Sequence, residues 1–332
     1  MASRGCSSRD RATSRSATSG SGGPEVAPAS RVVVVSGASG LIGRALVPAL
    51  GAAGYTVVRL VREREAGPGE LRWQPEAGAL DLTAAHPEGV HAVIHLAGEN
   101  IGEGRWSEAR KRSILESRVQ GTRTIVNAMK ALATPPAALV SASGVGYYGG
   151  TRGDVELDES APAGDDFPAV VCRAWEAETE PAAAAGIRVV RMRTGVVLTP
   201  EGGALQRLLT PFKLGLGGKV GGGRQWMSWV TMADTIAAYL FALARPIHGP
   251  VNLVAPGAVT QAELAKTLAR VLGRPSLVPL PGFAVKMMFG EMGDALLLGG
   301  QRAAPRRLLA EGFAFAHPEL EPALRAVLGK RA

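Results

Sequence analysis

Residues 31–61 combine the features of a buried strand, a glycine-rich turn, a helix and a second strand. They read RVVVVSGASGLIGRALVPALGAAGYTVVRLV. The four consecutive valines at 32–35 predict a strand that is buried on both faces, because a strand with one solvated face alternates apolar and polar residues. A helix is expected over residues 41–53, Gly54 is expected to end it, and YTVVRLV predicts the second strand. This order predicts a βαβ unit with two parallel strands.

The same alternation continues to about residue 200. HAVIHLAG, AALVSASG and IRVVRMRTGVVL predict further strands, and SEARKRSILESRVQGTRTIVNAMKALA predicts a long helix. A shorter helix is expected around VVCRAWEAE, residues 170–178, with Asp165 or Asp166 as its N-cap and Pro168 near its first turn. Alternating strands and helices predict an α/β fold, a Rossmann-type doubly wound parallel sheet over residues 31–200.

Residues 201–332 begin with a Gly-rich, irregular stretch and continue with mixed patterns. ADTIAAYLFALA predicts a helix, PVNLVAP a short strand, and TQAELAKTLARVLGRP a helix with Thr260 as its cap. We expect this part to form a smaller C-terminal substrate lobe against the sheet. A ligand would then bind in the crevice at the carboxyl ends of the parallel strands.

Residues 1–30 are rich in Ser, Arg and Gly and poor in large apolar residues, which predicts a disordered tail. A solvated extension or a start codon placed too far upstream is the favoured interpretation. An organelle transit peptide, which is also rich in Ser and Arg, is the alternative. We therefore expect a cytoplasmic protein, with organelle import as the less favoured location.

The composition argues against several classes of partner. The chain of 332 residues has a net charge of +8, which suits anionic small molecules, but it has no zinc-finger spacing or aromatic RNA-binding motif. No apolar run approaches the roughly eighteen residues that a membrane helix needs. Cys6 and Cys172 do not suggest a structural disulfide, and the five histidines form no metal-ligand pattern. We expect a small-molecule substrate, no nucleic acid, no membrane and no metal; the oligomeric state is left open.

The turn SGASGLIG places Gly37, Gly40 and Gly43 in a G-x-x-G-x-x-G pattern. Glycine permits a tight turn, the close approach of a phosphate to the backbone and close packing of the helix on the strand. The helix that follows would offer unpaired N–H groups to a pyrophosphate. Because the pattern follows a strand and opens a helix, it predicts dinucleotide binding.

The end of the second strand bears on which dinucleotide binds. An acidic residue at this point would bind the ribose 2′-hydroxyl of NAD, but the chain reads RLVRERE and places Arg62 there. A guanidinium suits a 2′-phosphate, so NADP is the expected cofactor. Glu63, the next residue, keeps NAD open as the alternative.

These motifs together resemble the extended and atypical short-chain dehydrogenase/reductases, which are NAD-dependent epimerase/dehydratase-like proteins. The resemblance is strongest to the branch labelled "epimerase family protein", which carries a C-terminal domain of unknown function, here at about residues 275–325. It rests on SGASGLIG, VIHLAGENI, RWSEARKRSILESRVQGT, SGVGYYG, VCRAWEAE, VRMRTGVVL, GGALQRLLTPFKLGLGGKVGGGRQWMSW, LGRPSLVPLP, FGEM and LLLGGQRAAPRRLLAEGFAF. These stretches run in order from about residue 31 to residue 328.

The resemblance implies a cofactor site, residue by residue. Its members would be Gly37, Ser39, Gly40, Leu41, Ile42, Gly43, Val61, Arg62, Leu96, Ala97, Gly98, Arg118, Thr194 and Val197. The six residues from Gly37 to Gly43 in this list would hold the pyrophosphate. Val61 and Arg62 would meet the adenosine ribose and its phosphate. The three residues of the HLAG stretch would pass under the ribose and the phosphates. Arg118 matches a cofactor-contacting arginine, and the stretch from Thr194 to Val197 would flank the nicotinamide.

Enzymes of this superfamily usually carry a tyrosine, the general acid/base, and a lysine four residues later on one helix face. Residues 167–185 of this chain contain neither a tyrosine nor a lysine. Ser143 stands where the resemblance places a strand-end hydroxyl that orients the substrate oxygen, and Tyr147 is the phenol we expect to face the substrate. Tyr148 matches a structural tyrosine and is expected to pack in the loop.

Other polar residues have plainer interpretations. Arg173 and Glu176 are expected to form a surface pair on the helix, and nothing local supports Cys172 as a nucleophile. Residues 224–226, RQW, lie in a segment that resembles one closing over the substrate. They would either recognise an anionic or sugar-like group or simply pack the lobe. Thr231 occupies a position where the family often has a histidine, which leaves Asp234 as a cap or structural residue.

The sequence leaves two functions open. The favoured one is an NADP-dependent oxidoreductase or epimerase that acts on a small polar substrate, with Ser143 and Tyr147 as candidate catalytic residues. The alternative is an NADP-binding regulatory protein without turnover, which the missing Tyr-Lys pair motivates.

Overall fold

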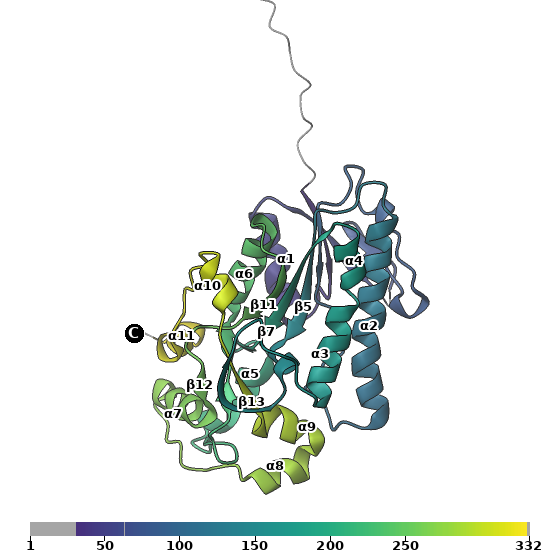
Figure 1. Ribbon diagram of the computed structural model, residues 1–332. Coiled ribbons are helices and arrows are strands. Elements are labelled where there is room, and N and C mark those ends of the chain that lie inside the picture. The colour runs from purple at the N-terminus through teal and green to yellow at the C-terminus, as the bar shows by residue number, and fades with distance from the viewer. Residues whose placement is uncertain (1–30, 63, 331–332) are drawn as a thin grey trace, which may run out of the picture.

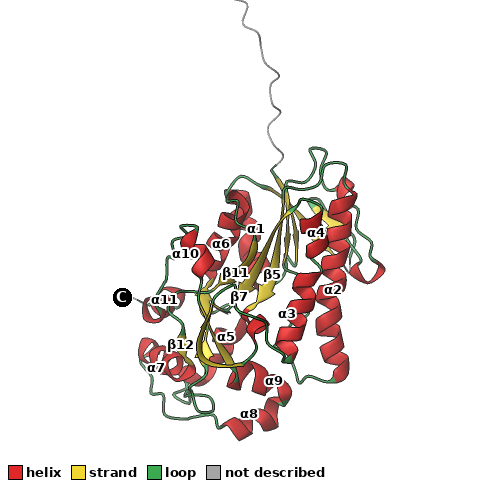
Figure 2. Ribbon diagram, in the orientation of Figure 1, coloured by secondary structure: helices red, strands yellow, loops and turns green. Residues whose placement is uncertain are grey.

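Seven parallel strands form the central sheet of the computed structural model, which describes residues 31–62 and 64–330 (Figures 1 and 2). Their order across the sheet is β11-β7-β5-β4-β1-β2-β3. The strands are β1 (Val32–Ser36), β2 (Thr56–Val61), β3 (Glu70–Arg72), β4 (Ala92–His95), β5 (Ala138–Gly144), β7 (Arg188–Thr194) and β11 (Gly249–Leu253). The expected doubly wound parallel sheet is confirmed. The tail expected over residues 1–30 lies outside the described residues.

Helices cover both faces of this sheet (Figure 1). On one face lie α1 (Leu41–Ala52) and α6 (Met232–Ala244); on the other lie α2 (Glu108–Ala131), α3 (Phe167–Ala177) and α4 (Glu180–Ala184). The valines of β1 explain this layering, since Val33 and Val35 pack in the core with α1 and α6, while Val32 and Val34 pack in the core with α2. A strand between two helical layers needs apolar residues on both faces.

The ends of the helices follow the predicted capping residues. Asp166 caps α3 by accepting the N–H of Ala169, with Pro168 in the first turn. Thr260 and Glu263 form a reciprocal capping box at the start of the helix over Gln261–Leu272. Gly54 has a φ of +81° just after α1, a left-handed conformation that glycine adopts without strain.

The smaller lobe contains α5 (Gly203–Lys213), α7 (Gln261–Leu272), α8 (Gly282–Phe289), α9 (Glu291–Gly293) and α11 (Leu320–Val327), whereas α10 (Arg306–Ala310) packs against β11 at the edge of the central sheet. Three small sheets accompany them: β8 (Val196–Leu198) with β10 (Trp229–Thr231), β9 (Trp226–Met227) with β12 (Val259–Thr260), and β6 (Thr151–Leu157) with β13 (Gly300–Ala303). Phe212, Trp229, Leu268 and Leu324 belong to the separate core of this lobe. Because α6 and β11 return to the central sheet, the sheet takes residues from both sides of the division expected at residue 200.

Asp234 has a structural role at the junction between α6 and the C-terminal segment. Thr231 is the N-cap of α6, and its hydroxyl donates to the buried carboxylate of Asp234 at 2.9 Å. The same carboxylate accepts the backbone N–H groups of Ala316 and His317, at 2.7 and 3.1 Å. Asp234 therefore fastens the segment after α10 to the sheet domain.

Gly195 divides a stretch that the sequence presents as one strand. The prediction of a single strand over IRVVRMRTGVVL is wrong, because β7 ends at Thr194 in the central sheet and β8 pairs with β10 in the smaller lobe. A Cβ atom at Gly195 would lie 2.5 Å from the backbone oxygen of Ser228. The two lobes therefore approach each other at Gly195 more closely than any side chain permits.

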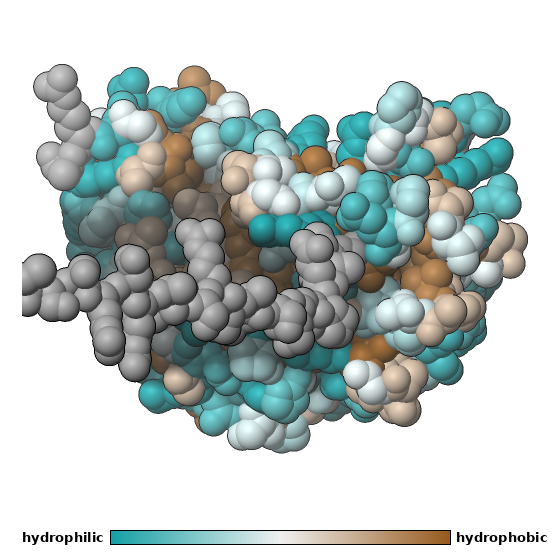
Figure 3. All heavy atoms as spheres, turned by 90° about the horizontal axis from the view of Figure 1, so that it is seen from above, coloured by the Kyte–Doolittle hydropathy of each residue, from teal (hydrophilic) through white to brown (hydrophobic). Residues whose placement is uncertain are grey.

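Seen from above, the molecule shows hydrophilic side chains over much of the outer rim, with hydrophobic residues largely in its recessed parts (Figure 3). Within residues 31–62 and 64–330, none of the helices is both long enough and apolar enough to cross a membrane.

Replacing Gly195 with alanine is expected to destabilise the protein, because the added methyl group would clash with Ser228. We expect the free energy of unfolding in urea to fall by about 1–3 kcal/mol, the usual cost of overpacking. Gly51→Ala in α1 is the control, since a Cβ atom there meets nothing within 4 Å, and it should stabilise by about 0.5–1 kcal/mol. Equal effects of the two substitutions would contradict this account of Gly195.

Candidate functional site

The glycine turn between β1 and α1 is packed too tightly for side chains at two positions. Gly37 has a φ of +68°, and a Cβ atom there would lie 2.8 Å from the backbone nitrogen of Ala97. A Cβ atom at Gly43 would lie 2.2 Å from the carbonyl oxygen of Gly37. Gly40, the N-cap of α1, has no side chain to bind the first N–H groups of the helix. The turn therefore leaves backbone donors at the helix N-terminus for an anionic ligand.

A cavity of about 850 Å³ opens over this turn, at the carboxyl ends of β1, β2 and β4. Eight of the expected cofactor residues line it: Gly37, Ser39, Gly40, Val61, Arg62, Leu96, Ala97 and Gly98. Leu41, Ile42 and Gly43 form the first turn of α1 just outside the lining, where Leu41 packs against Gly202. Val197 packs against the sheet core. It lines neither this cavity nor a second one at the ends of β5 and β7.

Four arginines, Arg44, Arg59, Arg62 and Arg64, stand on the wall of this first cavity. Glu70 pairs with two of them, at 2.9 Å from Arg59 and 2.6 Å from Arg64, and the hydrogen bond from Arg64 lowers the pKa of Glu70 to about 2. Glu70 thus stays ionised near neutral pH and holds both guanidinium groups in place. Within the described part of the chain, Arg44 and Arg62 have no acidic partner, so two free cations face the cavity.

Sequence reasoning found Arg62 but missed the other three arginines. Arg59 could have been found, because it lies two residues before Val61 in β2 and so points to the same face. Arg44 directly follows the glycine pattern, in the first turn of α1. Arg64 had no signal of this kind, because its position depends on the pairing of β2 with β3 and on Glu70.

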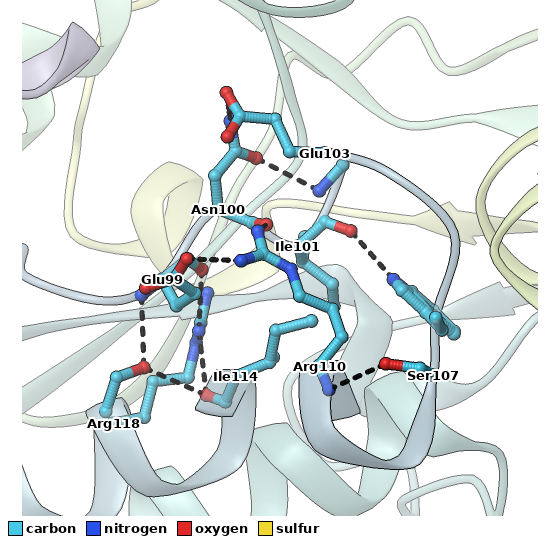
Figure 4. Close-up of polar contacts among 11 residues, drawn as sticks. Glu99, Asn100, Ile101, Glu103, Ser107, Arg110, Ile114 and Arg118 are labelled. Atoms are coloured by element: carbon cyan, nitrogen blue, oxygen red, sulfur yellow. Dashed lines mark hydrogen bonds and ion pairs between the residues drawn. The ribbon is translucent and has the colours of Figure 1, made fainter. Parts of the chain in front are cut away.

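The loop after β4 joins the first cavity to a second one, and α2 holds it in place (Figure 4). Arg110 of α2 pairs with the carboxylate of Glu99 and donates to the carbonyl oxygen of Asn100 at 2.7 Å. Ser107 caps α2 by accepting the N–H of Arg110. Gly98 of this loop lines the first cavity and Ile101 lines the second.

Arg118 lies beneath the same loop and is buried. It donates to the carbonyl oxygens of Glu99 and Ile114, at 2.9 and 3.0 Å (Figure 4). Its guanidinium carbon lies 4.9 Å from the centre of the Trp175 ring of α3, a cation–π contact. A Cβ atom at Gly98 would lie 3.2 Å from the guanidinium carbon of Arg118. A glycine at this position therefore leaves room for the Arg118 side chain beneath the loop.

The second cavity, of about 370 Å³, lies where β5 and β7 end. Ser143 and Thr194 come from the ends of these strands, Cys172 and Trp175 from α3, and residues 295–296 and 299–301 of the smaller lobe close the opposite side. The expected residues Ser143, Arg118 and Thr194 are therefore brought together on one wall. Trp175 occupies one of the positions where the resemblance called for a lysine.

A buried ion pair supports this wall. Glu176 of α3 accepts two hydrogen bonds from Arg193 of β7, both at 2.9 Å, and a third from the hydroxyl of Ser143 at 2.7 Å. The expected surface pair of Arg173 and Glu176 is wrong: Arg173 is exposed, whereas Glu176 and Arg193 are only 5% and 3% exposed. The carboxylate faces the sheet because α3 packs against β5, and there it meets Arg193 of β7.

The two tyrosines after β5 also meet Arg193. Tyr148 is fully buried, and its hydroxyl donates to Asn252 at 2.7 Å and accepts from Arg193 at 3.0 Å, which confirms its structural role. Burial raises the pKa of Tyr148 to about 12. The ring of Tyr147 lies under the Arg193 guanidinium, 3.4 Å from its carbon, and does not line the second cavity.

Cys172 lies on the cavity wall as a thiol. Burial raises its pKa to about 11, so the thiolate that a nucleophile requires is scarce near neutral pH. In residues 31–62 and 64–330, no three His, Cys, Asp or Glu side chains gather as a metal site.

Two family models match successive parts of the chain. The model of the NAD dependent epimerase/dehydratase family matches residues 33–254, and a domain of unknown function, DUF1731, matches residues 280–327. The chain belongs to the NAD dependent epimerase/dehydratase family. Its DUF1731 segment supplies residues 295–296 and 299–301 of the second cavity.

Similar proteins cover nearly the whole chain. An "epimerase family protein" of Mycobacterium bovis is 46% identical over 297 residues, which are 89% of this chain and 97% of that protein. The crystal structure of human epimerase family protein SDR39U1 with NADPH is 37% identical, with a TM-score of 0.81 and coverage of 90% of this chain and 99% of that one. A nucleoside-diphosphate sugar epimerase from Corynebacterium glutamicum is 35% identical, with a TM-score of 0.75, and the match covers 90% of this chain and 58% of that one.

The segment at residues 224–226 mainly packs within the smaller lobe. Gln225 donates to the carbonyl oxygens of Val220 and Leu297, at 3.1 and 2.8 Å. Trp226 lines the second cavity but donates its indole N–H to Asp154 at 2.8 Å. Arg224 is exposed and lies outside the lining of either cavity.

Removing one partner of the buried pair is expected to destabilise the protein strongly. Glu176→Ala leaves Arg193 charged and buried, and we expect the free energy of unfolding to fall by about 3–5 kcal/mol in urea titrations. The double variant Glu176→Leu with Arg193→Met removes both charges and should be less destabilised than Glu176→Ala. A double variant that is less stable than the single one would contradict the ion-pair account.

Proposed function

We propose that the protein is an NADP-dependent oxidoreductase that transfers hydride between the nicotinamide and a small molecule bound in the second cavity. The observation that carries the proposal is the placement of two adjoining cavities along one edge of the sheet. Gly98 lines the first and Ile101, in the same loop, lines the second, so an extended dinucleotide can run from one to the other. The human relative crystallised with NADPH supports this cofactor.

The residues present fit the cofactor. The glycine turn forms a cradle that side chains would fill, and the free guanidinium groups of Arg44 and Arg62 suit the two charges of a 2′-phosphate. NAD, which lacks that phosphate, would leave both cations unpaired. When bound, the nicotinamide supplies or accepts the hydride.

Ser143 is the group we assign to the reacting oxygen. Its single hydroxyl proton is donated to Glu176, and Ser143 lines the cavity, so we assign its oxygen as the acceptor for a substrate hydroxyl. In the oxidation direction, Ser143 would take the substrate proton as it passes its own proton to Glu176. In the reduction direction the same transfers would run in reverse, after Glu176 has taken up a proton from water that Ser143 then passes on to the substrate oxygen.

A second candidate function follows from α3. The helix lacks a Tyr-Lys pair, and Trp175 with its stacked Arg118 fills part of the space beside the cavity. A protein of this kind could bind NADP and signal its presence without turnover. An epimerase would return the hydride to the same substrate and consume no NADPH.

The expected cytoplasmic location stays a prediction.

Removing the free arginines is expected to weaken NADPH binding selectively. Each of Arg62→Ala and Arg44→Ala should raise the Kd of NADPH by about 10- to 100-fold, the loss of a charged hydrogen bond, and should change the Kd of NADH little. Fluorescence titration with the two cofactors measures both constants. A control is Arg173→Ala, which lies on the exposed side of α3. Equal losses for NADPH and NADH would contradict the assignment of the 2′-phosphate.

Turnover is the test of the proposed reaction. Ser143→Ala should lower kcat for carbonyl-dependent NADPH oxidation by on the order of 10²–10⁴-fold, the range for loss of a proton-transfer group. Tyr147→Phe keeps the ring under Arg193 and should change kcat little. If NADPH binds tightly but a broad panel of carbonyl compounds gives no oxidation, the regulatory function is favoured instead.

A further inference from the structure

The second cavity is lined mainly by apolar side chains. Val145, Val171, Trp175, Val196, Met227 and Leu296 stand on its walls. They come from the turn after β5, from α3, from β8 and β9, and from the π-helix at Asp294–Leu298. With a volume of about 370 Å³, the cavity is near the lower limit for small-molecule sites, and it must also receive the nicotinamide.

Most polar side chains of the cavity wall are engaged with other parts of the protein, although the buried indole N–H of Trp175 has no hydrogen-bond partner among the described residues. Five donate hydrogen bonds within the protein: Ser143 to Glu176, Thr194 to Met192, Ser228 to Gln301, Gln301 to Gly149 and Trp226 to Asp154. A ligand with many hydroxyl groups would therefore meet few free donors. Loss of its hydration would go largely uncompensated.

The cavity offers a charged ligand a single cation. Arg118 is the one charged residue among the described residues that line it; it is only 8% exposed, one of its nitrogens donates to two backbone carbonyls, and it stacks on the Trp175 ring. The first cavity differs sharply, because Arg44 and Arg62 both face it with no acidic partner among the described residues. A diphosphate or a carboxylate needs cationic or multiple N–H partners once it leaves water. The second cavity offers only the remaining N–H groups of this one buried guanidinium, which favours an uncharged ligand.

We propose that the substrate is a small, uncharged molecule with an apolar body and a single carbonyl or hydroxyl group placed at Ser143. This proposal rests on the proposed function and names the substrate class for the same site. It differs from the small polar substrate expected from the sequence. It also sets the chain apart from the Corynebacterium neighbour, which is described as a nucleoside-diphosphate sugar epimerase.

Direct binding to the NADPH-loaded protein tests the proposal without requiring turnover. Acetophenone serves as the apolar carbonyl probe, pyruvate as the charged one and UDP-glucose as the nucleotide sugar. NADPH at saturation keeps the nucleotide sugar out of the first cavity. Saturation-transfer NMR and calorimetry should show saturable binding of acetophenone and none of the other two at the same concentration. Absence of acetophenone binding, or tighter binding of pyruvate or UDP-glucose, would overturn the proposal.

A charged substitution on the cavity wall locates the binding. Leu296→Asp should weaken acetophenone binding by about tenfold or more, because it places a carboxylate against the apolar body. Leu297→Asp is the matched control: it is the next residue of the same π-helix but does not line the cavity, and it should leave binding unchanged. Unchanged NADPH affinity shows that each variant is folded. Equal effects of the two variants would place acetophenone elsewhere and overturn the proposal.

The outcomes separate this inference from the proposed function. If acetophenone binds in the cavity but is never reduced, the substrate class stands and the oxidoreductase function fails. If pyruvate or UDP-glucose is the compound that binds and reacts, the oxidoreductase function stands and the substrate class fails. The probe comparison on the unaltered protein decides this even if Leu296→Asp does not fold.

Discussion

The buried ion pair between Glu176 and Arg193 holds together the part of the structure where chemistry would occur. It joins α3 to β7, receives the hydroxyl of Ser143 from β5, and fixes Tyr148 through Arg193. An unpaired charge at this depth would be costly, so each partner requires the other. The wall of the second cavity depends on that mutual requirement, because Ser143 and Cys172 lie next to the pair.

The two cavities share one edge of the sheet but differ in electrostatic character. The first has a glycine cradle and four arginines, two of them paired with the single carboxylate of Glu70 and two with no acidic partner among the described residues. The second is apolar and closed by the DUF1731 segment, and its one charged lining residue is occupied by the protein. This division suits a dinucleotide whose charged end lies in the first cavity and whose uncharged nicotinamide reaches the second.

Local features were predictable from the sequence, and features that depend on contacts between distant elements were not. The valines of β1, the glycine turn and the caps at Asp166 and Thr260 act within a few residues, and all have the predicted structure. The partner of Glu176 was missed because Arg173 is close on the helix, whereas Arg193 lies 17 residues away on β7. Gly195 was missed as a boundary because its constraint comes from Ser228 in the other lobe.

A crystal structure of the protein with NADPH tests the central claim most directly. The account predicts the 2′-phosphate within about 3 Å of the Arg62 or Arg44 guanidinium and the nicotinamide ring in the second cavity, beside Thr194 and facing Ser143. A nicotinamide that lies outside this cavity, with the stacked Arg118 and Trp175 barring its entry, would contradict the account.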